Sequence, residues 1–161
     1  MSDPGQPLAA PSTQDAVALV RDDHAAIGVA FDTLLAALHG EASEADRQGL
    51  LSRVALRLRA HGQIEREFLY PALRSAASDG AEAEAEHAAF EKALETISAM
   101  KPPMPQHSEA IQALAADVER HFADEEATLL TAAASRGVDL LALGTQMALR
   151  RGVLLADLGV D

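Results

Sequence analysis

The chain has 161 residues, a formal net charge of −12 and no cysteine. This length suits one domain with a sizeable core, and the lack of cysteine excludes disulfides, zinc-thiolate sites and cysteine-held iron-sulfur clusters. The acidic balance repels phosphate backbones, so we expect no nucleic-acid partner. No apolar run reaches the roughly 18 residues of a membrane span and the N-terminus lacks signal-peptide features, so we expect no membrane partner and a cytoplasmic location.

Composition and periodicity predict an all-α chain. Aromatic residues make up only 3%, and the abundance of Leu and Ala favours helices over strands. Residues 1–11, rich in Pro and Gly, are expected to form a flexible tail, and residues 12–161 a single helical domain. A capping box of Ser12 and Asp15 opens the first predicted helix, which stops near residue 39.

Further helices follow in chain order, joined by short connections. Ser43 and Asp46 cap the second helix, which is expected to bend or end soon after Pro71. The third starts in the acidic stretch at 81–86 and cannot pass the prolines of 101–105. The fourth covers about 106–135, and a shorter fifth covers about 139–155. This order predicts an up-down antiparallel four-helix bundle with a short C-terminal fifth helix.

Each of the four long helices carries one histidine on its apolar stripe, and two of these histidines are followed at i+4 by a glutamate. The histidines are His24, His61, His87 and His121, and the glutamates are Glu65 and Glu125. Side chains four residues apart share a helix face. Because unpaired polar groups are costly to bury, the pattern predicts a metal between the helices.

The helical rise offers a test of this metal site, since a shared site needs all four histidines at one depth. In the first hairpin the two distances agree, with ~24 Å from His24 to the helix end and ~26 Å back to His61. In the hairpin of the third and fourth helices they agree as well, with ~20 Å from His87 to the helix end and ~22 Å back to His121. The second-to-third connection fits only if the second helix bends or ends soon after Pro71, or if the loop climbs the bundle.

The number and type of candidate ligands favour two metals bridged by carboxylates. Zinc takes three or four ligands at one centre, whereas six to eight candidates converge here, and mixed imidazole and carboxylate donors favour iron or manganese. A ferritin-like site needs Glu-x-x-His on two helices, and only Glu84 with His87 has this spacing. His39 and His107 are expected to be solvated and uninvolved.

Four motifs resemble the hemerythrin-like, or HHE cation-binding, domain over roughly residues 15–150. They are DDHAAI around His24, HGQIEREFLYPAL from His61, HAAFEKAL from His87 and HFADEEATLL from His121. The resemblance implies that the four histidines are terminal ligands and that Glu65 and Glu125 bridge two non-haem irons, together with an oxo or hydroxo group. It also implies a reaction with dioxygen or another small diatomic.

The chain departs from the oxygen-carrying hemerythrins at two places. They have a second histidine four residues after the one matched by His87, where this chain has Glu91. Glu91 either ligates a metal or is a solvated helix residue, and Glu84 has the same two interpretations. The last carboxylate is Glu125 at i+4 from His121, where the carriers place Asp at i+5. Thr128 either lines the oxygen pocket or bonds its own i−4 carbonyl.

These observations predict a di-iron protein that binds or senses dioxygen or a related diatomic. The expected site has a vacant coordination position in a dry cavity lined by Ile27, Phe31, Leu58 and Phe90. One alternative is a di-iron redox enzyme of peroxidase, oxidase or iron-sulfur repair type, although the repair type commonly carries a cysteine. The other is a structural metal-binding interaction module.

Overall fold

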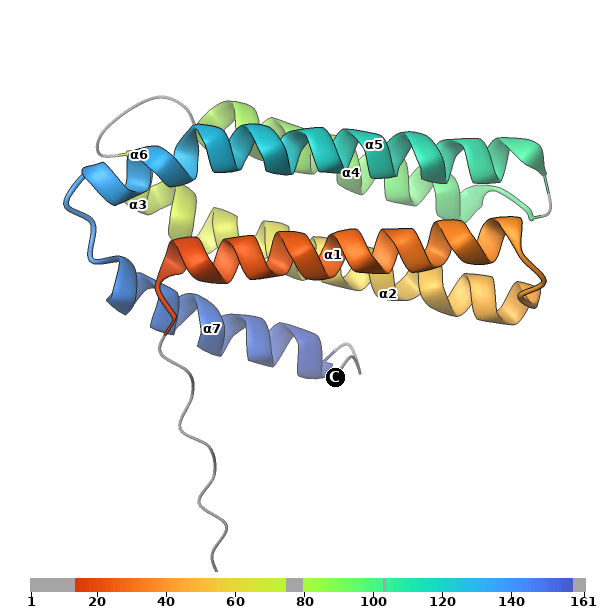
Figure 1. The fold of residues 1–161 in the computed structure, drawn as a ribbon, viewed down its shortest axis with the longest axis horizontal. Coiled ribbons are helices and arrows are strands. Elements are labelled where there is room, and N and C mark those ends of the chain that lie inside the picture. The colour runs from red at the N-terminus through yellow and green to blue at the C-terminus, as the bar shows by residue number, and fades with distance from the viewer. Residues whose placement is uncertain (1–13, 75–79, 103, 158–161) are drawn as a thin grey trace, which may run out of the picture.

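The computed structural model describes residues 14–74, 80–102 and 104–157, and these fold into helices without strands (Figure 1). In order they are α1 (Ala16–His39), α2 (Glu44–Ile64), the π-helix η1 (Glu65–Leu69), α3 (Tyr70–Arg74), α4 (Gly80–Ala99), α5 (Pro105–Ala127), α6 (Leu129–Ser135) and α7 (Leu140–Asp157). The helices α1, α2, α4 and α5 form the predicted up-down bundle, and α7 packs on α1 and α2. No helix in the described ranges is long and apolar enough to cross a membrane.

At the N-terminal ends of two helices, a capping side chain marks where the helix begins. Asp15 caps α1, where its Oδ1 accepts from the Ala18 N–H at 2.8 Å. Ser12, the predicted cap, lies outside the described residues, and α1 begins directly after Asp15. Ser43 caps α2 as predicted, since its hydroxyl accepts from the Asp46 N–H at 3.1 Å. Such caps satisfy amide groups that have no partner within the helix.

The second predicted helix changes its geometry before it ends. Between α2 and α3 lies the π-helical turn η1, in which the Tyr70 N–H donates to the Glu65 carbonyl five residues back. Pro71 follows, and α3 ends at Arg74. The regular α-helical hydrogen bonding of this predicted helix already changes at Glu65, before Pro71, and residues 75–79 lie outside the described part of the chain.

The fourth predicted helix is divided in two at Thr128. The Thr128 hydroxyl and the Thr128 N–H both donate to the Asp124 carbonyl, at 2.7 and 3.0 Å. This confirms that the hydroxyl bonds its own i−4 carbonyl. The α-helix α5 stops at Ala127, and α6 begins at Leu129.

The apolar core is split into two clusters along the bundle. One cluster lies toward the α1–α2 and α4–α5 connections and includes Phe31, Val54, Leu94 and Leu114. The other lies around α3, α6 and α7 and includes Leu19, Leu73, Leu130 and Met147. On α1, α2, α4 and α5 the predicted ligand residues fall where one cluster gives way to the other. The four histidines therefore lie at one depth, as the helical rise predicts.

Candidate metal centre

A layer of six buried side chains crosses the bundle between the two apolar clusters. They are His24, His61, Glu65, His87, His121 and Glu125, each no more than 5% exposed. They form two groups that each offer donor atoms within 4.8 Å of one another, and both glutamates belong to both groups. The structure thus brings together six of the seven residues predicted as ligands.

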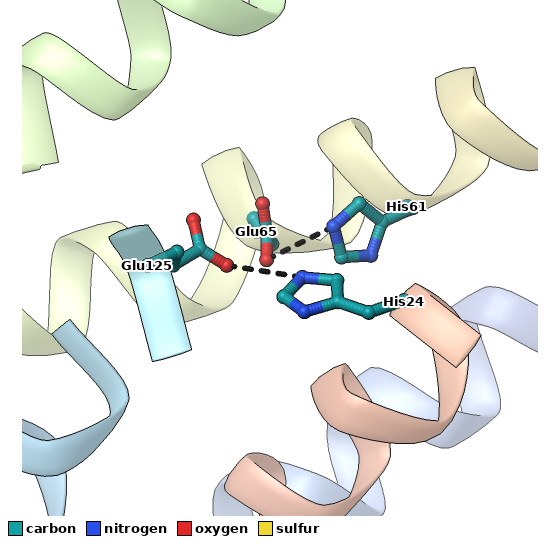
Figure 2. A group of neighbouring side chains, drawn as sticks. All are labelled: His24, His61, Glu65 and Glu125. Carbon is teal, nitrogen blue, oxygen red and sulfur yellow. Dashed lines mark ion pairs between the residues drawn. The ribbon is translucent and has the colours of Figure 1, made fainter. Parts of the chain in front are cut away.

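The first group contains His24 and His61 with one oxygen from each glutamate (Figure 2). His24 Nε2 lies 3.3 Å from Glu125 Oε1, and His61 Nε2 lies 3.2 Å from Glu65 Oε1. Each of these four atoms is buried and has no hydrogen-bond partner in the described part of the chain. Because unpaired buried polar atoms are costly, the donor set fits a cation between them.

The second group uses the other oxygen of each glutamate. His87 Nε2 lies 2.8 Å from Glu65 Oε2, and His121 Nε2 lies 3.5 Å from Glu125 Oε2. The two imidazole nitrogens are 3.1 Å apart. Each glutamate therefore presents one oxygen to each pair of histidines, which is the arrangement a bridging carboxylate needs.

Tyr70 belongs to this layer, although its sequence position did not suggest it. Its hydroxyl lies within hydrogen-bond distance of both glutamates, 2.8 Å from Glu65 Oε2 and 3.1 Å from Glu125 Oε2. Its side chain is fully buried. Burial, and then the two carboxylates, raise the pKa of Tyr70, so the phenol stays protonated and donates.

The π-helical turn explains how Tyr70 reaches the site. In an α-helix, residues five apart point in different directions, whereas residues four apart share a face. The turn η1 pairs residues five apart, so Tyr70 returns to the face of Glu65. Single π turns occur often at functional sites. Pro71 was the only sequence signal of irregular backbone here.

Three further carboxylates contact the outward-facing nitrogens of the imidazoles. Glu126 Oε1 lies 2.7 Å from His24 Nδ1, Asp23 Oδ2 lies 3.4 Å from His61 Nδ1, and Glu86 contacts His121 Nδ1. Such contacts fix the tautomer that leaves Nε2 free for a metal. None of the three was predicted from the sequence, yet each is the chain neighbour of a predicted ligand and contacts a histidine on another helix.

His87 is placed by close packing. Its Nδ1 faces the Cα of Gly62, where a Cβ would lie only 2.8 Å away. The HGQIE motif therefore contains a glycine because α2 must leave room for the ring from α4. Burial, and then the imidazoles of His61 and His121, lower the pKa of His87 to about 2, so the ring is neutral as a ligand must be.

The two glutamates differ in their affinity for a proton. Burial, and then the negative charge of Glu125, raise the pKa of Glu65. Burial alone would raise the pKa of Glu125 as well, but the nearby imidazole of His24 and the carboxyl of Glu65 lower it. The metal-free pair therefore holds a proton on Glu65, and a cation that binds both carboxylates must displace it.

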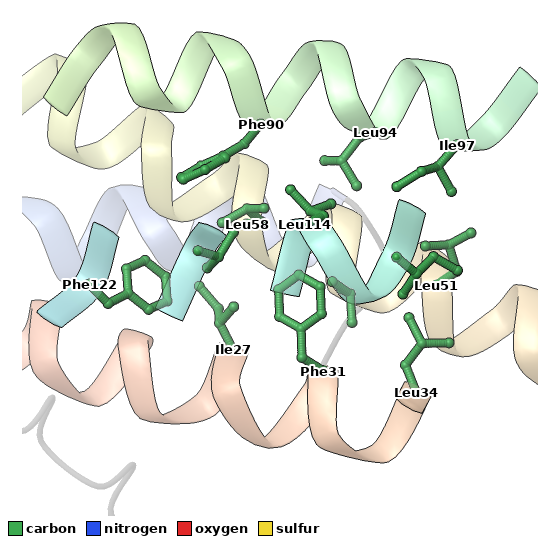
Figure 3. Packing of buried hydrophobic residues seen from close by; sticks show 13 residues of the cluster. Ile27, Phe31, Leu34, Leu51, Leu58, Phe90, Leu94, Ile97, Leu114 and Phe122 are labelled. Carbon is green, nitrogen blue, oxygen red and sulfur yellow. The ribbon is translucent and has the colours of Figure 1, made fainter. Parts of the chain in front are cut away.

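A cavity of about 350 Å³ between α4 and α5 reaches the second group. It is lined by Glu82, Ala83, Glu86, His121, Asp124, Glu125, Thr128 and Leu129. Ile27, Phe31, Leu58 and Phe90, which were predicted to line a dry cavity, pack together in one buried core cluster (Figure 3). Phe31 also lines a second cavity of about 620 Å³ between α1 and α5, which reaches His24 of the first group. The cavity at the second group is polar and acidic.

Glu91 lies apart from the layer. Its Oε2 accepts from Arg59 Nε at 2.8 Å, its side chain is 34% exposed, and it belongs to neither ligand group. Glu84 also belongs to neither group. The structure therefore does not place either residue with the possible metal ligands.

The two remaining histidines differ from each other. His39 is exposed, and its Nε2 lies 3.1 Å from Gln112 Nε2. The expectation that His107 is solvated is wrong, because it is only 7% exposed. Helix α5 begins at Pro105, so residue 107 lies one turn before the core residue Ile111 and shares its buried face.

Comparisons with known proteins agree with this geometry. The model of the hemerythrin HHE cation-binding domain matches residues 15–133. The crystal structure of an HHE cation-binding domain-containing protein from Mycobacterium kansasii, an Rv2633c homolog, superposes with a TM-score of 0.78 and 22% identity over 89% of each chain. A Nostoc protein named DNA nickase is 29% identical over 117 residues, which are 71% of this chain and 32% of that protein. This chain therefore spans about a third of that relative.

Proposed function

We propose, because this chain belongs to the hemerythrin HHE cation-binding domain family, that it holds two non-haem irons and binds or senses dioxygen or a related diatomic. The observation that carries the proposal is the pair of ligand groups that share both glutamates. Four unpartnered buried donor atoms in the first group support it. Mixed imidazole and carboxylate donors suit iron.

The proposed roles follow from the contacts. His24 and His61 would hold one ion, His87 and His121 the other, and Glu65 and Glu125 both. The bound irons would supply electrons to a diatomic molecule. Phe122 stacks on the His24 ring at 3.8 Å between centroids and an interplanar angle of 12°, which holds that ring in place and shields it from water.

A second candidate, a di-iron redox enzyme, is favoured by Tyr70. An enzyme that reduces dioxygen or a peroxide consumes protons as well as electrons. The Tyr70 hydroxyl is a proton donor, buried against both bridging glutamates. The cavity beside Glu86 and Asp124 adds polar groups that could relay protons to solvent.

The nickase activity in the name of the Nostoc relative belongs to that longer protein. That protein is about three times as long as the matched segment, so its nickase activity can reside in a part that has no counterpart here. The net charge of −12 also opposes binding to a phosphate backbone. We therefore propose that this chain has no nucleic-acid partner.

Iron content after reconstitution tests the site. We expect two irons per chain in the wild type and a large loss in Glu65→Ala, because that variant removes an oxygen from each ligand group. The control Glu91→Ala should retain both irons, since Glu91 contacts Arg59. One iron per chain in the wild type, or equal iron in wild type and Glu65→Ala, would contradict the proposal.

Stopped-flow spectra separate the two candidate functions. The reduced protein is mixed with dioxygen and then deoxygenated. A carrier or sensor should return to its reduced spectrum on deoxygenation, whereas an enzyme should stay oxidised until a reductant is added. Tyr70→Phe should prolong a reversible oxygenated form if the phenol delivers a proton, and it should change nothing if Tyr70 only packs.

A further inference from the structure

We propose that Arg151 on α7 is a positioning residue for one of the two metals. Acting through Asp23, it holds the His61 ring in the orientation that aims Nε2 at the metal pair. This inference rests on the proposed function. Arg151 lies outside residues 15–133, the part that matches the family model, so the contact is a feature of this chain beyond that match.

The contacts form a chain from α7 to the ligand. Arg151 Nη1 lies 2.5 Å from Asp23 Oδ1, and the other oxygen, Oδ2, lies 3.4 Å from His61 Nδ1. Each carboxylate oxygen thus has its own partner. His61 Nε2, on the opposite side of the ring, is one of the buried donor atoms without a partner. Rotation of Asp23 would therefore release the ring that this nitrogen belongs to.

Asp23 differs from the other two carboxylates that contact imidazoles. Its side chain is only 13% exposed, whereas those of Glu126 and Glu86 are 38% and 42% exposed. Water can stabilise the two glutamates, but a largely buried aspartate needs a countercharge. Arg151 supplies it, with Nη1 against Asp23 Oδ1. Without Arg151, Asp23 would gain by turning to solvent and leaving His61.

The expected consequence is confined to one metal. Asp23 contacts His61 in the first ligand group, while His87 and His121 hold the second. Loss of an outer carboxylate contact typically weakens a metal site roughly 10- to 100-fold. Arg151→Gln should therefore weaken one metal equivalent and spare the other.

Arg150 provides a matched control on the same helix. Its Nε donates to Glu67 Oε2 at 2.9 Å, so it also ties α7 to the segment that carries the ligands. Arg150→Gln removes a two-bond, more exposed α7 ion pair to a carboxylate outside the two ligand groups. Arg151→Lys keeps the positive charge and should retain most of the wild-type affinity for the metal held by His61.

The test has a metal-loaded arm and a metal-free arm. Titration with Co²⁺ should show one equivalent weakened about tenfold in Arg151→Gln, and neither weakened in Arg150→Gln. In metal-free protein, ¹⁵N spectra of the imidazoles should change at His61 alone in Arg151→Gln. Equal weakening of both equivalents by both arginine variants would show that α7 acts only as packing and would overturn the proposal.

The two arms also separate this inference from the proposed function. Unchanged His61 signals in metal-free Arg151→Gln would overturn the positioning role whatever metal the site takes. If the wild type bound only one metal, the di-iron proposal would fail, yet the His61 signals would still decide whether Arg151 positions that ring.

Discussion

At the scale of single residues, Tyr70 gives the metal centre its own spectroscopic reporter. It is the one tyrosine of the chain, and the chain has no tryptophan. Its hydroxyl lies between the two glutamates that each face both pairs of histidines. Any change in tyrosine emission therefore originates within the ligand layer.

We expect Fe²⁺ or Co²⁺, added to metal-free protein without oxygen, to quench the tyrosine emission until two equivalents are bound. Open-shell ions quench a fluorophore at contact distance, and Tyr70 hydrogen-bonds the proposed bridging ligands. Zn²⁺, which has a filled d shell, should bind without comparable quenching. Full emission in the presence of bound Co²⁺ would place the metal away from Tyr70.

The proton held on Glu65 predicts how the stability of the metal-free protein depends on pH. Burial and Glu125 raise its pKa, so the folded protein holds this proton more tightly than the unfolded chain. The stability contributed by protonated Glu65 is fully present below the unfolded-state pKa of about 4.3 and is lost as the pH rises through the folded-state pKa. Glu65→Gln cannot ionise and should therefore become more stable than wild type as the pH rises.

Chemical denaturation in EDTA, at pH values from the unfolded-state pKa of Glu65 through its folded-state pKa, measures the difference in the free energy of unfolding between wild type and Glu65→Gln. His61 and His87 titrate in both proteins, so their contribution largely cancels in the difference. Bound iron should reverse the order, because the ionised carboxylate is then a ligand. Parallel curves for wild type and Glu65→Gln would show that Glu65 ionises normally.

At the scale of helices, the ligands that could be predicted from the sequence are those that regular α-helical periodicity places on one face. His61 with Glu65 and His121 with Glu125 stand at i+4, so a regular α-helix places both pairs correctly. Tyr70 could not be found in this way, because it reaches the site only through a π turn. The partners Asp23, Glu86 and Glu126 depend on how neighbouring helices are rotated, and spacing within one helix does not reveal that rotation.

Gly62 on α2 allows the close fit between α2 and the His87 ring to be tested. In Gly62→Ala the new Cβ would lie 2.8 Å from His87 Nδ1, so the ring must move. We expect one metal equivalent to weaken roughly 10- to 100-fold, as when an imidazole loses its proper orientation. Metal titration measures this weakening, and denaturation of the metal-free protein measures any change in the free energy of unfolding.

Gly49→Ala on the same helix is the control. Nothing lies within 4 Å of its added Cβ, so it should stabilise α2 by about 0.5–1 kcal/mol, because alanine loses less backbone entropy than glycine. If Gly62→Ala behaved like Gly49→Ala and kept both metals, the close fit between α2 and His87 would have no role in ligation.

At the scale of the whole molecule, the ligand layer is enclosed by apolar packing at both ends. The cluster around α3, α6 and α7 closes one side, and Met147 of α7 is among its fully buried members. Helix α7 contacts α1, α2 and η1, which carry three of the six ligand residues. The fifth helix is therefore part of the structure that supports the metal centre and not an appended element.

At Gly144, α7 lies close against the backbone at the start of α1. A Cβ there would lie 2.6 Å from the backbone nitrogen of Ala16 and closer still to the Gln14 carbonyl. Backbone atoms cannot yield as a flexible side chain can, so Gly144→Ala must push α7 away from the bundle. We expect a loss of about 1–3 kcal/mol in the free energy of unfolding, typical of overpacking.

Gly152→Ala, also on α7, should have the opposite effect, because nothing lies within 4 Å of its added Cβ and alanine is the better helix former. Denaturation of both variants measures the difference. Displacement of α7 in Gly144→Ala should also draw Arg151 from Asp23 and weaken the metal held by His61. If Gly144→Ala were as stable as wild type with both metals unchanged, α7 would tolerate movement, and the docking of the fifth helix would matter little to the centre it covers.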